Sequence, residues 1–438
     1  VVLQAFDEWG TGCLDKFNGM WAFVIYDKKK KEIFISRDRY GIKPFYYYSD
    51  KNKFIFASEI PSILKILERK PNPNYQVLFD YLVFNRTDQT EMTFFEGIKK
   101  LQHGHVIIIR KSRTSPAFCG FEIHKWYDLK QKVKNTVPFK NPEEYKNTFN
   151  SAIGLRLRSD VPVGVCLSGG LDSSSIVSTL LKDFNKNDLN TFSAIYEKGS
   201  TGDESEYIKE YSSSLTNMFY ITPSAESLYA DMDDFVTAHG EPVPSTSPYA
   251  QFKVMELAKN NVVVTLDGQG ADEQLAGYHY FYGFYFKELL KNFRWLRLLS
   301  ETFHCLNNHK SLYGVKTFLY FLLPKNIKSK VRVAEKGYLN PEFVHNFSSD
   351  NQVAGNIYSS DSLNDALFNH FEYKLEHLLK WEDRNSMWFS LESRVPFLDH
   401  RLVEKTLAIN SDMIINKGIT KYILREALKG TLPEKIRA

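Results

Sequence analysis

Residues 163–174 constrain the fold of this chain more than any other segment. A short apolar run at 163–167 leads into a loop of Ser, Gly and Asp, and a helix is expected from about Ser175. Such a turn suits a bound phosphate, because backbone N–H groups can close on an anion where side chains are missing. The N-terminus of the helix adds unpaired donors and partial positive charge. The alternative is an ordinary strand-to-helix turn.

The composition of this loop favours phosphate bound together with a metal ion. Its candidate phosphate ligands are Ser168, Gly169, Gly170, Ser173 and Ser174. Asp172 would repel phosphate unless a Mg²⁺ bridges the two. No Lys-Ser/Thr pair follows the glycines, so the loop is not of the Walker type.

Residues 142 to about 275 alternate between helical and extended patterns. Asn141, Pro142 and two acids begin the first helix with an N-cap, a proline and negative charge. Apolar runs predict strands at 163–167, 191–195, 219–222 and 262–266, with helices near 142–158, 175–181, 204–215, 225–239 and 249–260. This alternation predicts an α/β fold with a parallel sheet covered by helices on both faces. The sequence after 275 is mainly helical.

The first 137 residues have a different pattern. Short aromatic and β-branched runs predict an antiparallel α+β domain, a meander with strands at 20–26, 32–36, 45–48, 53–57 and 105–110. Helices are expected near 58–68 and 75–84. Residues 128–142 are polar and contain two prolines, as in a linker. We therefore expect one domain at 1–137 and another at 138–438.

A second loop with glycines and acids follows the apolar run at 262–266. It contains Asp267, Gly268, Gln269, Gly270 and Asp272. The carboxyl ends of parallel strands share one edge of a sheet, where ligands bind, so this loop and the first should meet. Asp172 and Asp272 could then face one another across Mg²⁺ and pyrophosphate. A tight turn capped by an acidic helix start is the alternative.

Composition excludes several classes of function. The net charge is +4 and no basic face is apparent, which argues against a nucleic-acid partner. No apolar run is long enough to span a membrane, and no signal peptide is seen. The four cysteines, Cys13, Cys119, Cys166 and Cys305, are scattered and include no C-x-x-C, which favours a reduced, cytoplasmic setting.

Charged residues also occur inside apolar stretches near the C-terminus. Residues 378–387 and 391–399 alternate charge with apolar side chains, which indicates buried or half-buried ion pairs. Lys421 lies at a predicted helix start, where it could neutralise charge on phosphate oxygens. A surface lysine is the alternative.

Together these segments resemble a known family, the glutamine-hydrolysing asparagine synthetases, in which a PP-loop ATP pyrophosphatase domain follows a class II glutaminase domain. Residues 167–174 are similar to the PP-loop, and 268–273 with Gly277-Tyr278 resemble the second nucleotide loop. Residues 386–387 and 392–399 resemble a later signature, and 7–10, 17–23 and 37–44 resemble the glutaminase half. The resemblance covers nearly the whole chain.

The resemblance implies ATP and Mg²⁺ as cofactors and aspartate and glutamine or ammonia as substrates, and it is compatible with a homodimer. Aspartate would be adenylated with release of pyrophosphate, and ammonia would attack the adenylate. The implied pyrophosphate ligands are Ser168, Gly169, Gly170, Asp172, Ser173 and Ser174, and the implied adenosine contacts are Leu167, Ala194, Asp267 and Gly268. Asp172 and Asp272 would bind Mg²⁺, and Lys421 would stabilise the transition state of adenylation.

This chain departs from the family pattern at several positions. The family's nucleophile is an N-terminal cysteine, whereas this sequence starts at Val1, so the glutaminase nucleophile is expected to be absent. Cys13 is not a candidate for it. The sequence also stops at Ala438, before the family's usual C-terminal region. Gln269 occupies a position within the nucleotide site where many members have Glu, and 241–248 lacks the Arg found nearby in well-studied members.

These departures leave other functions open. One is an amide-forming relative that acts on another carboxylate, as in the β-lactam or macrolactam synthetases. A non-catalytic nucleotide-binding relative is a second. A PP-loop enzyme that modifies tRNA is a third, and the small net charge argues against it.

Overall fold

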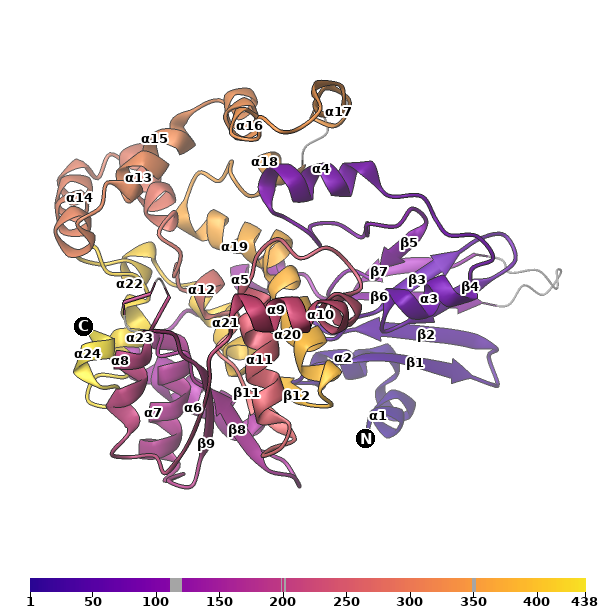
Figure 1. Ribbon diagram of the computed structural model, residues 1–438, viewed down its shortest axis with the longest axis horizontal. Helices are drawn as coiled ribbons and strands as arrows, with labels where there is room; N and C mark the ends of the chain where they lie inside the picture. The colour runs from indigo at the N-terminus through magenta and orange to yellow at the C-terminus, as the bar shows by residue number, and fades with distance from the viewer. Residues whose placement is uncertain (111–119, 198, 201, 349–351) are drawn as a thin grey trace. The chain divides into compact units, whose positions relative to one another are not determined.

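The structure is a computed structural model that describes residues 1–110, 120–197, 199–200, 202–348 and 352–438 (Figure 1). Cys119 therefore lies outside the described residues. The chain divides into two compact units, Val1–Val77 with Thr90–Leu129 and Leu78–Gln89 with Lys130–Ala438. The segment Leu78–Gln89 thus packs with the unit that follows it in sequence.

The first unit contains antiparallel strands in two sheets, ordered β1-β2-β6-β7 and β4-β3-β5. The strands are β1 Ala22–Asp27, β2 Glu32–Arg37, β3 Tyr46–Ser49, β4 Phe54–Ala57, β5 Ile98–Lys100, β6 His105–Arg110 and β7 Glu122–Lys125. We expected one meander, but β2 pairs with β6 and not with β3. Apolar side chains from both sheets, including Ile35, Ile107 and Tyr47, share one core and hold the sheets together.

Short helices accompany these strands. They are α1 Val2–Trp9, η1 Gly10–Gly12, α2 Cys13–Lys16 and α3 Ile60–Ile66, while α4 Tyr75–Phe84 and α5 Leu129–Lys134 cross the division between the units. The helix α5 lies within residues 128–142, the segment that we expected to be a linker. Leu129 and Val133 lie one turn apart on α5 and are both buried, so the segment has an apolar face.

The second unit contains the predicted parallel sheet, in the order β10-β9-β8-β11-β12. Its strands are β8 Val163–Cys166, β9 Asn190–Ala194, β10 Asn217–Ile221, β11 Val264–Leu266 and β12 Glu392–Arg394. Val264 pairs with Val163 and Leu266 with Val165, so the two strands that precede the candidate loops are neighbours. Sequence analysis did not anticipate β12, which pairs with the far side of β11.

Helices pack on this sheet as the alternating pattern predicts (Figure 1). The helix α11 lies against β9 and β10, α20 against β12, and α7 against β8. The helices up to α12 are α6 Pro142–Arg156, α7 Leu171–Asp183, α8 Ser205–Ile208, η2 Lys209–Tyr211, α9 Ala225–Ala230, α10 Met232–His239, α11 Ser247–Ala258 and α12 Ala271–Gln274. The buried ring of Phe192 in β9 packs on Val254 and Met255 of α11 and forms the core on that face.

The remainder of the chain is mainly helical, as expected. These elements are α13 Phe281–Lys291, α14 Trp295–His309, α15 Tyr313–Leu322, α16 Lys325–Ala334, α17 Pro341–Phe347, α18 Gln352–Asn356, α19 Leu363–Tyr373, α20 Leu375–Trp388, η3 Pro396–Leu398, α21 His400–Leu407, α22 Ser411–Ile414, α23 Tyr422–Ala427 and α24 Glu434–Arg437. Among the described residues, no helix has both the length and the hydrophobicity to cross a bilayer.

Some helix boundaries differ from prediction. The helix α7 begins at Leu171 and not near Ser175, because Gly170 is its N-cap and Asp172 occupies its first turn, where negative charge is favourable. The helix expected at 225–239 breaks at Asp231, whose carboxylate accepts a hydrogen bond from Tyr249 and pairs with Lys253. These partners hold Asp231 at the junction of α9 and α10.

Candidate active site

The two candidate loops meet at one edge of the sheet. They follow the neighbouring parallel strands β8 and β11 and leave them in the same direction. A Cβ atom at Gly268 would lie 3.0 Å from the Cβ of Asp172 and 3.2 Å from the backbone N of Ser173. A larger residue at 268 would push the loops apart, so the glycine permits their close approach. The predicted meeting of the loops is confirmed.

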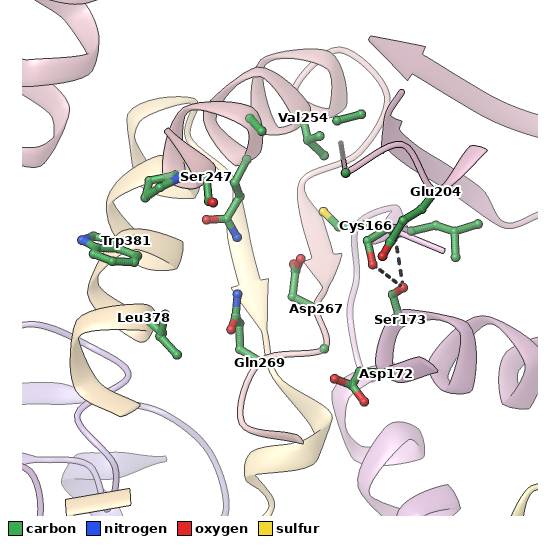
Figure 2. Close-up of a pocket in the computed structure, with 18 of the residues that line it drawn as sticks. Cys166, Asp172, Ser173, Glu204, Ser247, Val254, Asp267, Gln269, Leu378 and Trp381 are labelled. Atoms are coloured by element: carbon green, nitrogen blue, oxygen red, sulfur yellow. Dashed lines mark hydrogen bonds between the residues drawn. The ribbon is translucent and has the colours of Figure 1, made fainter. Parts of the chain in front are cut away.

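A cavity of about 660 Å³ opens where the loops meet. Figure 2 shows Leu378 and Trp381 on one side, Asp172 and Glu204 on the opposite side, and Asp267 between them. Most of the predicted site residues line it, namely Leu167, Ser168, Asp172, Ser173, Ala194, Asp267, Gly268, Gln269 and Asp272. Gly169, Gly170, Ser174 and Lys421 are not among its lining residues.

Lys421 joins the two loops through ion pairs. Its Nζ lies 2.7 Å from each carboxylate oxygen of Asp172 and 2.5 Å from Oδ1 of Asp272. Burial opposes the charged form of Lys421, but the two carboxylates raise its pKa above its usual range. Burial raises the pKa of Asp172 to about 6, and Lys421 opposes this rise. The positive charge of Lys421 therefore lies between the carboxylates of Asp172 and Asp272, next to the N-terminus of α7.

A third segment fixes Lys421 in this position. Its backbone has φ 55°, in the left-handed region, and its N–H donates to the carbonyl of Leu275 at 3.1 Å. A Cβ at Gly277 would fall 1.7 Å from Oδ1 of Asp272 and 2.5 Å from Cε of Lys421. Any side chain at 277 would collide with the ion pair. The Gly-Tyr pair after the second loop thus makes room for the lysine.

The hydroxyl groups of the first loop bond to one another. The backbone N–H of Ser168 donates to Oγ of Ser173 at 3.1 Å, and the two Oγ atoms are also 3.1 Å apart (Figure 2). The N–H of Gly170 donates to Oγ of Ser168 at 3.2 Å. Ser174 is fully buried, and its Oγ has no hydrogen-bond partner among the described residues. Ser168 and Ser173 line the cavity, whereas Ser174 does not.

A second carboxylate pair lies deeper, at the ends of β11 and β12. Asp267 Oδ2 accepts hydrogen bonds from Thr265 and Ser393, each at 2.9 Å. Oε1 of Glu382 lies 2.5 Å from Oγ of Ser393, and its Oε2 accepts from Gln251 and Gln269. Burial raises the pKa of Asp267, and burial followed by the charge of Asp267 raises that of Glu382 far above its usual range. We infer that Glu382 is protonated.

The residues at this site fit a nucleoside triphosphate with a divalent cation. Two carboxylates beside a phosphate loop, completed by phosphate oxygens and water, are a ligand set that Mg²⁺ accepts. Among the described residues there is no group of three or more His, Cys, Asp or Glu side chains that could hold a metal alone. Phe192, Ala194 and Val254 give the opposite end of the cavity an apolar wall suited to a base.

Sequence analysis missed several residues of this site. Glu204, Gln251 and Trp381 line the cavity, and Glu382 supports it from behind. Glu204 follows β9, so its place near a strand end was a usable signal. We had interpreted 378–387 as a run of buried ion pairs. Lys380 does pair with Asp88 and Glu241, but Glu382 is bonded to hydroxyl and amide groups instead.

Comparison with known proteins identifies both parts of the chain. The profile of the asparagine synthase family matches residues 144–438, and that of a glutamine amidotransferase domain matches residues 1–126. These matches confirm the resemblance seen in the motifs. The predicted boundary at 137/138 falls between them and stays a prediction.

Named relatives agree with these matches. "Asparagine synthetase [glutamine-hydrolyzing] 3" of Bacillus subtilis (strain 168) is 28% identical over 450 residues, which cover 100% of this chain and 68% of that protein. "Putative asparagine synthetase [glutamine-hydrolyzing] 2" of Methanocaldococcus jannaschii is 36% identical over 284 residues, or 64% of this chain and 53% of that protein. "Amidase chry2" of Gibberella zeae is 26% identical over 486 residues, which cover 100% of this chain and 70% of that protein.

The aligned residues thus span between 53% and 70% of the length of these relatives. The matches support glutamine-dependent asparagine synthesis and do not favour the lactam-forming or non-catalytic alternatives. The family profile covers well over half of the chain and includes both loops and Lys421. The chain therefore belongs to the asparagine synthase family.

Proposed function

We propose that this chain catalyses the ATP-dependent conversion of aspartate to asparagine with ammonia derived from glutamine. The observation that carries the proposal is the junction of Asp172, Asp272 and Lys421, where two loops of one parallel sheet meet beside a cavity. A cation between two carboxylates at a helix N-terminus is suited to a phosphate chain that carries a metal ion.

In the first step, an oxygen of the side-chain carboxylate of aspartate forms a bond to the α-phosphorus of ATP. The bond from that phosphorus to the bridging oxygen breaks, and pyrophosphate leaves with the electron pair. In the second step, the nitrogen of ammonia attacks the activated acyl carbon. AMP then leaves, and the new amide nitrogen loses a proton to solvent or to a base.

The residues of this chain would act mainly by charge and position. Ser168, Ser173 and the backbone around Gly169 and Gly170 would bind pyrophosphate, and Lys421 would neutralise charge that develops on the phosphate oxygens. Leu167, Ala194, Asp267 and Gly268 would contact the adenosine, with Gln269 at the boundary with the acceptor. Asp172 and Asp272 would hold Mg²⁺, which offsets the negative charge of the phosphates when it is bound.

Several finer features belong to the same proposal. The unit matched by the amidotransferase profile would supply ammonia from glutamine in the whole protein. A cytoplasmic location agrees with Cys13, Cys166 and Cys305, which are free thiols in the structure. The homodimer that the family resemblance implies stays a prediction.

The test measures pyrophosphate release with ammonium chloride as nitrogen source, so that the amidotransferase unit is not required. Aspartate should stimulate release, whereas glutamate and other carboxylic acids should give little. Formation of AMP and asparagine in equal amounts would support the full reaction. Release that does not depend on aspartate, or that responds better to another acid, would overturn the choice of substrate.

A further inference from the structure

The helix α14 turns apolar side chains to the outside and a carboxylate to the inside. Leu296, Leu299 and Phe303 succeed one another at spacings of three and four residues, so they form one stripe along the helix. Their exposed fractions are 86%, 69% and 67%. On the inner face, Glu301 is buried and accepts hydrogen bonds from two backbone N–H groups. A surface helix ordinarily turns its apolar stripe to the core, so the arrangement in α14 is inverted.

The next helix, α15, also exposes apolar side chains. Leu312 and Leu319 are more than half exposed, whereas Phe321 on the inner face stacks on a ring of α13. The two helices touch, because a Cβ atom at Gly314 would lie 3.2 Å from Sγ of Cys305 in α14. Both lie at the periphery of the second unit, next to α13 (Figure 1). We call the five exposed residues the apolar surface, namely Leu296, Leu299, Phe303, Leu312 and Leu319.

The segment that carries the apolar surface is strongly basic. Residues 291–336 contain ten Lys and Arg and two Asp and Glu, a net charge of +8 in a chain whose total is +4. The small charge of the whole chain conceals this concentration. Asp361 and Asp412 pair with some of these cations. Lys310 and Lys316 are exposed, and among the described residues no carboxylate forms an ion pair with either. The surface is therefore complementary to an anionic partner.

The charge and the shape of this surface disfavour a protein partner. In a two-fold symmetric dimer the same patch faces itself, so a second copy would bring two basic segments together. A different protein would have to supply pockets for side chains that protrude, because the residues that dominate protein interfaces fill well-packed pockets. Leu296 is 86% exposed and Phe293, just before α14, is 78% exposed. Nucleic acids attract the lysines but leave the leucines in water.

An anionic lipid bilayer accepts both kinds of side chain. Apolar groups enter the boundary between headgroups and acyl chains one by one, and no preformed pocket is needed. Trp295, at the start of α14, is half exposed, and tryptophan is favoured at this depth. Lysines beside the inserted groups are attracted to the phosphates of anionic lipids. This mode of binding requires no helix that crosses the bilayer.

We propose that α14 and α15 bind this protein reversibly to the surface of an anionic membrane. The apolar surface enters the headgroup region, and Lys310 and Lys316 lie at the lipid phosphates. The inference goes beyond the proposed function and does not depend on it, because none of these residues lines the cavity. Its consequence is that the reaction takes place next to a membrane.

The test is flotation of the whole chain with two kinds of vesicle, phosphatidylcholine alone and equal parts of phosphatidylcholine and phosphatidylglycerol. The protein should float with the anionic vesicles only, and added salt should weaken the binding. The double variant Leu296→Ser/Leu299→Ser should lower the partition coefficient roughly 10- to 100-fold. The double variant Lys310→Glu/Lys316→Glu should lower it roughly 10-fold or more.

Two controls change matched side chains elsewhere in the second unit. Val236→Ser removes an exposed apolar residue of α10, and Lys429→Glu reverses the charge of an exposed lysine outside residues 291–336. Both should float as wild type does, and all variants should unfold at the wild-type denaturant concentration because the changed side chains are exposed.

Two results would overturn the proposal. One is wild-type protein that ignores both kinds of vesicle or binds them equally. The other is a dimer in analytical ultracentrifugation that Leu296→Ser/Leu299→Ser dissociates, since this would assign the apolar surface to a second copy of the chain.

Discussion

Two pairs of carboxylates lie near the same edge of the parallel sheet, and their surroundings favour different charge states. Asp172 and Asp272 face a lysine, with Lys421 Nζ in contact with both. Asp267 and Glu382 have hydroxyl and amide neighbours, and no lysine or arginine of the described chain pairs with them. The first pair is balanced by a cation, whereas burial raises the pKa of both members of the second pair.

The difference between the two pairs follows from the groups that lie close enough to contact each of them. The first pair lies next to the N-terminus of α7, where Lys421, from a third segment of the chain, reaches between the two loops. The second lies deep at the ends of β11 and β12, where burial favours the neutral acid. The first pair is thus suited to hold cations beside phosphate, and the second to orient Gln251 and Gln269 by hydrogen bonds.

Removing the cation should have the largest effect. Lys421→Met leaves Asp172 and Asp272 without their common partner, which we expect to cost about 3–5 kcal/mol of folding free energy. Pyrophosphate release should fall by roughly 10²-fold or more. Chemical denaturation and a pyrophosphate assay measure the two effects, with Lys429→Met as control. Wild-type stability in the variant would mean that the ion pairs are unimportant.

Replacement of a carboxylic acid by its isosteric amide should then have a large effect at the first pair and a small effect at the second. Asp172→Asn removes a charge that Lys421 and Mg²⁺ need, so pyrophosphate release should fall roughly 10²-fold with little loss of folding. Glu382→Gln replaces a protonated acid by a neutral amide, so stability should change by less than about 1 kcal/mol. Chemical denaturation measures the second effect, and a large loss of stability in Glu382→Gln would show that Glu382 is ionised and that the comparison is wrong.

Adding a charge to the second pair should be moderately destabilising. Gln269 donates to Glu382 Oε2 at 3.4 Å, so Gln269→Glu loses a donor and brings in a third carboxyl group. We expect a loss of about 1–3 kcal/mol at pH 8, which shrinks at pH 5 as the carboxyls take up protons. Denaturation curves at the two pH values test this. An equal loss at both would show that charge is not the cause.

The smallest effect concerns a histidine at the end of the same network. His239 bonds to Asn385 at 3.0 Å, and Asn385 donates to Gln251, which donates to Glu382. Burial, assisted by the charge of Lys380, lowers the pKa of His239 to about 4, while the unfolded chain titrates near 6.5. Between these values only the unfolded state binds the proton, so stability is complete above pH 6.5 and falls as the pH drops toward 4.

The variant His239→Gln should therefore show a shallower loss of stability between pH 6.5 and 4. The difference in slope should reach at most about 1.4 kcal/mol per pH unit. His370 and His377 titrate in the same direction, so the slope should shrink without disappearing. Urea denaturation of both proteins at intervals of half a pH unit measures it. Parallel curves would show that His239 is not buried as a neutral ring.

Local patterns were enough to predict much of this architecture. Apolar runs that alternate with helices predicted the parallel sheet, and the glycines and acids after two of those runs predicted loops that meet. The sequence offered Lys421 as a lysine at a predicted helix start, but only the family resemblance related it to Asp172, which lies 249 positions away. Nothing in its own neighbourhood separates it from a surface lysine.

Other features had no local signal. The strand β12 is three residues long and exists because β11 offers it an edge. The raised pKa of Glu382 depends on its burial and then on the charge of Asp267, which lies in another part of the sequence.

The amino-acid sequence alone thus specified the succession of elements, the two loops and the kinds of side chain they offer to a phosphate. Those properties depend on neighbours along the chain, because periodicity, turn chemistry and helix capping act over a few residues. The tertiary structure decided the surroundings of each carboxylate and which cation lies between Asp172 and Asp272. Charge states depend on burial and on partners in space, and these exist only after distant segments have packed together.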